Sequence, residues 1–123
     1  MGVEFKLTRR IPQDRTDVAV LHLSGWLDAQ AEEQLVAAVK LAKDNGAVYV
    51  LLELRGVNTI TSAGLRGIQK SFRLLTPKGA SAIGRLKLCN ASPQVREVLS
   101  VTGLLISVPM YESEAIGIHS FGK

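Results

Sequence analysis

The sequence predicts an α/β fold: one domain, spanning residues 1–123, in which a mixed and mostly parallel sheet of about five strands carries about four helices. Two observations predict this class. Strand-like apolar runs alternate along the chain with stretches of helical period, which is typical of parallel strands joined by right-handed helical crossovers. The most apolar run, residues 47–54, also indicates a strand at the centre of a sheet, with helices on both of its faces.

The first half of the chain predicts a hairpin followed by a helix. Residues 3–8 alternate between apolar and polar side chains, which indicates a half-buried strand. Residues 18–23 are almost continuously apolar, so this second strand is expected to be covered on both faces. A short turn at residues 11–16 makes the two strands antiparallel. A helix is predicted from Ala29 to Asn45, with Asp28 as its N-cap.

In the second half of the chain, strands and helices alternate. The central strand is followed by a predicted loop from Arg55 to Ser62 and by a helix from Ala63 to Leu75 that Pro77-Lys78-Gly79 ends. The remaining elements are predicted in this order: a loop at 76–84, a strand at 85–89, a helix that begins at Ser92-Pro93 and ends at Gly103, a strand at 105–110 and a terminal helix at 112–118.

Composition limits the classes of function. Apolar residues make up 46% of the chain and charged residues 21%, which indicates a folded globular protein. No apolar run approaches the roughly 20 residues that span a bilayer, so no membrane insertion is expected. The polar N-terminus is no secretory signal, and a lone cysteine, Cys89, is typical of a reducing compartment, so we expect a cytoplasmic protein with an inert, buried thiol. The net charge of +4 is mild and aromatic residues make up 5%, which argues against direct binding of nucleic acid.

Ser62 is the leading candidate for a functional site. It lies where the segment after the central strand meets the predicted helix, and sites in such folds gather at the carboxyl ends of parallel strands. Free backbone amides and the helix dipole favour negative charge there, so a phosphoryl group would add about −1.5 to −2 charges without unfolding the helix. Ala63 and Gly64 are small enough to let a partner approach closely. The simpler interpretation is that Ser62 or Thr61 only caps the helix.

Two further features indicate a docking surface near Ser62. Ser62, Arg66, Lys70 and Arg73 follow one another at spacings of four, four and three, which places them on one stripe of the helix. That stripe is either a solvated positive face, a surface for an acidic partner, or a site for nucleic acid whose binding falls steeply with salt. Trp26, in the segment before the first helix, is either a lid over the edge of the core or an anchor for a partner.

The sequence does not predict an enzyme. A nucleophilic Ser62 would need a base, and the two histidines, His22 and His119, are better explained as structural or solvated residues. The segment Ile60-Thr61-Ser62-Ala63-Gly64 lacks the Gly-x-Ser-x-Gly elbow. No group of histidine, cysteine or carboxylate residues has the spacing of metal ligands, and no Walker loop is present, so no metal and no cofactor are expected. Weak nucleotide binding at the Ser62 turn stays open.

Three segments together resemble the STAS family, the anti-sigma-factor antagonists. The stretch from Leu54 to Leu65 resembles the signature of that family, in which a hydrophobic strand and a short loop precede Asp-Ser-Ser/Thr-Gly-Leu. Gly25-Trp26-Leu27-Asp28 is similar to its Gly-x-Leu-Asp turn. Ser92-Pro93-Gln94-Val95 with Thr102-Gly103-Leu104 is similar to its third helix and the exit from it. The resemblance extends over roughly residues 4 to 120 and implies a single STAS-like domain.

The resemblance also implies a function. Members of this size bind an anti-sigma factor, usually a small serine kinase of the histidine-kinase-like ATPase fold, and so free the sigma factor. The kinase phosphorylates the first serine of the signature, which corresponds to Ser62, and a phosphatase resets the switch. Asp28 matches the acidic residue expected near that serine. Thr61 stands where the signature has aspartate, and Ala63 where it has serine or threonine. Other relatives are binding modules without this switch, such as subunits of lipid-transport ABC systems.

Overall fold

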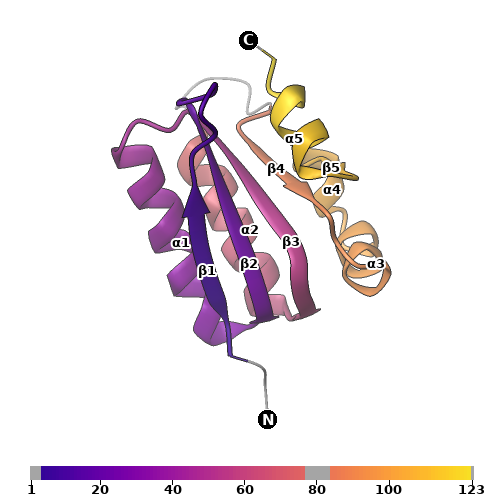
Figure 1. The fold of residues 1–123 in the computed structure, drawn as a ribbon. Coiled ribbons are helices and arrows are strands. Elements are labelled where there is room, and N and C mark those ends of the chain that lie inside the picture. The colour runs from indigo at the N-terminus through magenta and orange to yellow at the C-terminus, as the bar shows by residue number, and fades with distance from the viewer. Residues whose placement is uncertain (1–3, 77–83, 123) are drawn as a thin grey trace.

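A computed structural model, which describes residues 4–76 and 84–122, places five strands in one sheet with the order β1-β2-β3-β4-β5 (Figure 1). The described elements are β1 (Lys6–Arg10), β2 (Val18–Leu27), α1 (Ala29–Asp44), β3 (Tyr49–Ile60), α2 (Ser62–Leu75), β4 (Leu86–Cys89), α3 (Pro93–Val101), α4 (Leu104–Ser107), β5 (Met110–Tyr111) and α5 (Glu114–Ser120). β1 pairs with β2 antiparallel, and the other neighbouring strands are parallel. The predicted α/β class and the N-terminal hairpin are confirmed.

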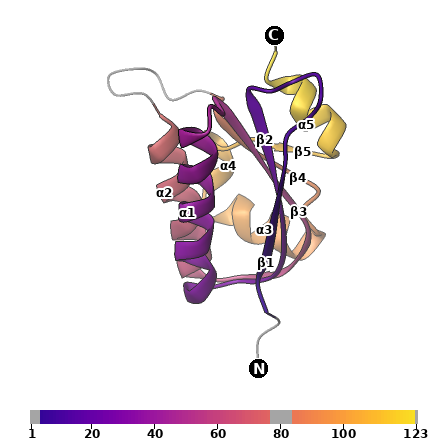
Figure 2. The ribbon, with the colours of Figure 1, turned by 60° about the vertical axis from the view of Figure 1, so that its left-hand side comes forward.

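The helices cover the two faces of the sheet unequally. α1 and α2 lie on one side of the sheet, and α5 lies on the other (Figure 2). The main core forms between the sheet and α1, α2, α3 and α4, and its largest fully buried side chains include Leu35, Leu52, Ile68 and Leu99. A smaller cluster under α5 contains Val20, Leu51 and Phe121. The prediction that the second strand is covered on both faces therefore holds for Val18–Leu21, whereas His22, Ser24 and Trp26 are only half-buried.

The predicted loop from Arg55 to Ser62 is wrong, because β3 continues as a strand to Ile60. Two register shifts against β2 explain the error. Between the pairs His22–Glu53 and Ser24–Gly56, and again between Gly25–Val57 and Trp26–Thr59, β3 has one residue more than β2. The buried residues of β3 that join the main core are consequently spaced by two up to Leu54 and then by three, at Val57 and Ile60. A spacing of three hides the alternation by which a strand is recognised in a sequence.

The predicted strand at 105–110 is also wrong. The chain forms the short helix α4 there, after Gly103 in a left-handed conformation with φ of 77°, and β5 is only Met110–Tyr111. Leu104 and Val108 are the buried residues of this segment, and their spacing of four brings them to one side of a helical turn. α2 ends at Leu75; the predicted stop at Pro77-Lys78-Gly79 lies outside the described residues.

α2 packs very closely onto the end of β2 through a glycine. A β-carbon built on Gly64 would lie 2.0 Å from the carbonyl oxygen of Leu27 and 2.9 Å from its carbonyl carbon. Backbone atoms cannot move aside as a flexible side chain can, so only glycine allows α2 to begin at this distance from the sheet. Gly64 is buried, and its small size therefore serves the packing of α2 against β2.

We expect Gly64→Ala to lower the free energy of unfolding by about 1–3 kcal/mol or more, because the added methyl group overpacks the contact with Leu27. Gly67→Ala is the matched control in the same helix. A β-carbon at Gly67 would lie 3.4 Å from its nearest neighbour, so the helix propensity of alanine should leave stability unchanged or raise it by up to about 1 kcal/mol. Urea denaturation of the three proteins measures both effects, and equal midpoints for Gly64→Ala and the wild type would contradict this account.

Candidate functional site

The carboxyl ends of β2 and β3 bring two helix starts side by side. Leu27 pairs with Ile60 at the end of the parallel ladder, and the next residue of each strand is a helix N-cap. The backbone amide of Thr61 donates to the carbonyl of Leu27 at 3.0 Å, which joins the two caps directly. The free amides of α1 and α2 therefore emerge at the same edge of the sheet, where the sequence predicted a site.

The two caps are made by the residues that the sequence identified. Asp28 Oδ1 accepts from the amides of Gln30 at 3.1 Å and Ala31 at 3.2 Å, as predicted for the first helix. Thr61 Oγ1 accepts from the amide of Gly64 at 3.3 Å and so caps α2. Ser62 is the first residue of α2, is exposed, and within residues 4–76 and 84–122 its hydroxyl forms no hydrogen bond. Of the two residues that could cap α2, Thr61 is the one that does, and the Ser62 hydroxyl is left accessible to a modifying enzyme or a partner.

Trp26, Asp28 and Thr61 meet around a cleft next to Ser62. The cleft has a volume of about 690 Å³ and is also lined by Glu4, Phe5, Ala29, Gln30 and Gln34. Trp26 lies on β2, is half-buried and lines this cleft. An apolar ring surrounded by carboxylate and amide groups can receive a single side chain from another protein.

The predicted stripe on α2 is partly engaged within the chain. Glu32 of α1 lies 2.9 Å from Arg66 Nε and 2.7 Å from Lys70 Nζ, and its side chain is 9% exposed. Arg66 binds the carboxylate through two nitrogens. Ser62 and Arg73, at the two ends of the stripe, are exposed, and Ala63 is half-buried. The role of Glu32 could not be predicted from the sequence, because an ion pair between two helices whose residues are 34 positions apart leaves no local pattern.

The charges around Glu32 shift its titration. Hydrogen bonds first from Arg66 and then from Lys70 lower the pKa of Glu32 from the ordinary 4.5 to about 2. The same contact raises the pKa of Arg66. The carboxylate is thus ionised at every pH at which the protein is expected to work, and it holds α1 and α2 together where both begin.

The residues considered for catalysis lie apart from Ser62. His22 faces the opposite side of the sheet from α1 and α2, where its Nε2 lies 2.7 Å from Glu114 Oε1. Cys89 is buried, and burial, followed by the charge of Glu53, raises the pKa of its thiol to about 12. Among residues 4–76 and 84–122, no three potential ligands gather as a metal site would require, and no helix has the length and apolar character needed to cross a membrane.

Comparison with known proteins gives one consistent family. A family model described as the STAS domain matches residues 10–116. BtrV of Bordetella bronchiseptica, named as an anti-sigma factor antagonist, is 32% identical over 114 residues, which cover 91% of this chain and 94% of that protein. An anti-sigma factor antagonist from Mycobacterium paratuberculosis superposes with a TM-score of 0.80 at 18% identity, covering 98% of this chain and 96% of the other. The phosphorylated form of the Bacillus cell fate determinant SpoIIAA superposes with a TM-score of 0.64 at 25% identity, covering 95% and 98%.

The Glu32 contact predicts a pH dependence of stability. Because its pKa is lower in the folded chain than in the unfolded chain, the carboxylate stabilises the fold above about pH 4.5, and this contribution is lost as the pH falls toward about 2. We therefore expect Glu32→Gln to lower the urea midpoint at neutral pH, with a difference from the wild type that narrows over that range. Glu33→Gln, at an exposed neighbour, should have little effect. A difference for Glu32→Gln that stays constant with pH would contradict the assignment.

Proposed function

Because this chain belongs to the STAS domain family, we propose that it is an anti-sigma factor antagonist whose binding to an anti-sigma factor is controlled by phosphorylation of Ser62. The observation that carries the proposal is the exposed Ser62 hydroxyl at the start of α2, beside a threonine that already supplies the cap bond. A solved relative of similar fold is a phosphorylated protein, which supports the same chemistry here. The relatives are named as anti-sigma factor antagonists, and the function that we propose is binding rather than catalysis.

The start of α2 suits a phosphoserine. A phosphoryl group on Ser62 would lie at the positive end of a 14-residue helix, where the dipole and the first amides stabilise negative charge. Since Thr61 holds the cap, the group can be added without breaking a hydrogen bond of the fold. The modification would therefore change the surface of the domain and leave its structure intact.

The surface that such a change would affect is the predicted stripe. Arg73 is exposed, and the side chains of Arg66 and Lys70 keep about half of their surface accessible while they bind Glu32. A partner that meets these three cations with acidic side chains would be repelled by a phosphate on Ser62, because it adds about −1.5 to −2 charges at the head of the same stripe. Trp26 and the cleft at Asp28 would supply an apolar contact beside it.

The partner that fits the family is an anti-sigma factor that is itself the kinase of Ser62, with the histidine-kinase-like ATPase fold, together with a phosphatase that restores the serine. Such a cycle would operate in the cytoplasm, with residues 1–123 acting as a single STAS domain. Thr61 contributes the cap bond of the aspartate that it replaces but not its charge, so kinase recognition would depend more on Trp26 and Asp28.

A second candidate is a STAS binding module that is not phosphorylated, such as a subunit of a lipid-transport ABC system. This candidate is supported by the two positions at which the chain departs from the family signature: Thr61 replaces the aspartate, and Ala63 replaces the serine or threonine. Isolation of the protein from its native cells, with mass spectrometry of the co-purifying proteins and of Ser62, separates the two. An ATPase-fold kinase favours the switch, and a transporter complex with an unmodified Ser62 favours the module.

Replacement of Ser62 tests the switch directly. Ser62→Ala should fold and bind the anti-sigma factor as the wild type does but incorporate no phosphate from ATP and the kinase. Ser62→Asp should weaken binding at least tenfold, or about 1.4 kcal/mol, as measured by isothermal titration calorimetry. Ser100→Asp, at an exposed serine of α3, is the control for added charge. If Ser62→Asp binds the anti-sigma factor as tightly as the wild type does, the electrostatic part of the proposal is wrong.

Reversal of one charge tests the polarity of the docking surface. We expect Arg73→Glu to weaken binding of the anti-sigma factor by about fivefold or more at low salt, with a smaller loss as salt screens the contact. Arg9→Glu makes the same change of charge on β1 and should leave the affinity near that of the wild type. Equal losses in both variants would show that only net charge matters and that α2 is not the contact.

A further inference from the structure

Arg66 is bound by Glu32 in a way that leaves part of its hydrogen-bonding capacity free. Its Nε donates to Glu32 Oε2 at 2.9 Å and its Nη2 donates to Oε1 at 3.0 Å, so the carboxylate occupies one edge of the guanidinium. A guanidinium carries five N–H donors. Nη1 donates to no group in the described part of the chain, and the Arg66 side chain is 54% exposed. The edge between Nη1 and Nη2 can therefore bind a second anion.

The contact with Glu32 also orders the guanidinium before any second anion arrives. A free arginine side chain loses conformational entropy when it is fixed by a ligand. Here two hydrogen bonds to a carboxylate that is 9% exposed have already fixed it. Lys70 Nζ lies 2.7 Å from the same carboxylate, so Glu32 keeps a second positive partner when Arg66 shares its charge. A second anion would thus meet a preorganised cation.

Ser62 is placed to bring such an anion to Arg66. It is the first residue of α2, it is exposed, and Arg66 follows it by four positions. Residues four apart on a helix have β-carbons about 5–6 Å from each other. The Cα–Cβ bond of a helical residue also tilts toward the N-terminus of the helix, which is the direction from Arg66 to Ser62. A phosphoryl group on Ser62 would therefore bring its acceptor oxygens to the same part of the helix surface as the guanidinium.

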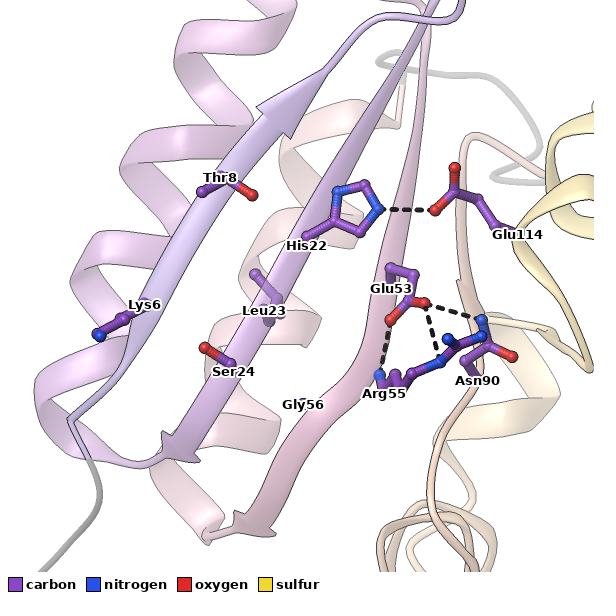
Figure 3. A pocket seen from close by; sticks show the side chains of 10 residues that line it. All are labelled: Lys6, Thr8, His22, Leu23, Ser24, Glu53, Arg55, Gly56, Asn90 and Glu114. Atoms are coloured by element: carbon purple, nitrogen blue, oxygen red, sulfur yellow. Dashed lines mark hydrogen bonds and ion pairs between the residues drawn. The ribbon is translucent and has the colours of Figure 1, made fainter.

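The charged side chains on the far face of the sheet do not take part in this arrangement. They line a cleft of about 580 Å³ over β1, β2 and β3, on the face opposite α2 (Figure 3). His22 Nε2 lies 2.7 Å from Glu114 Oε1 there. Glu53 accepts from Asn90 Nδ2 at 2.8 Å and lies 3.8 Å from Arg55. His22 and Arg55 are thus directed to carboxylates across the sheet from Ser62, and they offer no contact to a phosphoryl group on it.

We propose that Arg66 binds the phosphoryl group of phosphorylated Ser62 through its free edge while Glu32 holds the other edge, an inference that rests on the proposed phosphorylation of Ser62. The phosphate then occupies the position at which Arg66 would meet an acidic side chain of the anti-sigma factor. Phosphorylation would therefore weaken binding in two ways, because it adds negative charge at the head of the stripe and also withdraws one of the cations that the partner needs.

A phosphorus NMR titration against pH tests this contact on the full chain, with phosphoserine incorporated at position 62 during translation so that no kinase is required. We expect the second pKa of the phosphate to lie below that of phosphoserine in an unstructured peptide, because a nearby cation favours the dianion. Arg66→Gln should raise the midpoint of this titration by about 0.5 pH units or more. This variant is expected to fold, because Lys70 still pairs with Glu32.

Lys70→Gln, in the same phosphorylated chain, is the matched control. It also removes one cation from Glu32, but Lys70 follows Ser62 by eight positions, which is about 12 Å along the helix. Its midpoint should therefore rise less than half as far as that of Arg66→Gln. Asp28 and Glu32, the carboxylates at the start of α1, are unchanged in all three proteins, so the difference between the variants reports the lost cation.

Two results would overturn the inference. Equal midpoints for the wild type and Arg66→Gln would show that no contact forms, and equal rises in Arg66→Gln and Lys70→Gln would assign the effect to a loosened contact between α1 and α2. Either result would leave the proposed function standing, because the affinities of Ser62→Ala and Ser62→Asp test it separately. A raised midpoint in Arg66→Gln alone would support the contact even if Ser62→Asp bound the partner normally, and only the proposed function would then be wrong.

Discussion

The contact between the end of β2 and the start of α2 is the constraint on which the rest of the site depends. Gly64 allows the helix to begin against the carbonyl of Leu27, and the amide of Thr61 binds the same carbonyl. Because Leu27 also precedes the cap of α1, one short backbone segment fixes the positions of both helix starts. The exposed hydroxyl of Ser62 therefore stands on backbone that is tied to the sheet, and its neighbours Asp28 and Trp26 are placed by the same strand.

A second layer of organisation is electrostatic. Glu32 is almost buried between the two helices that begin at this edge, and it needs Arg66 and Lys70 to compensate for its desolvation. The same two cations form the middle of the surface that we assign to an acidic partner. A structural ion pair and a docking surface thus share residues, so that a substitution there would change folding and binding together. Arg73, which forms no ion pair within the described part of the chain, is the residue that separates the two effects.

Much of this architecture could be predicted, because its determinants are local. The alternation of strand and helix periods, the caps at Asp28 and Ser92, and the strand-to-helix corner at Ser62 all depend on residues a few positions apart. The errors have physical causes. Extra residues in β3 changed the apolar spacing, and the buried pair Leu104 and Val108 fits a helical turn as well as a strand. The partners of Glu32 and the unequal covering of the two faces of the sheet by helices depend on tertiary packing, which no short-range pattern records.

The two extra residues of β3 also decide which side of the sheet the end of this strand faces. Each extra residue reverses the side of the sheet that the following residues of β3 face. The residues of β3 that enter the main core therefore have even numbers up to Leu54, an odd number at Val57 and an even number again at Ile60. Loss of a single residue between Arg55 and Thr59 would leave Ile60 pointing away from the core. The chain would then enter α2 from the opposite side of the sheet. The exposed positions Arg55 and Asn58 should accordingly tolerate a change of side chain far better than the stretch tolerates a change of length.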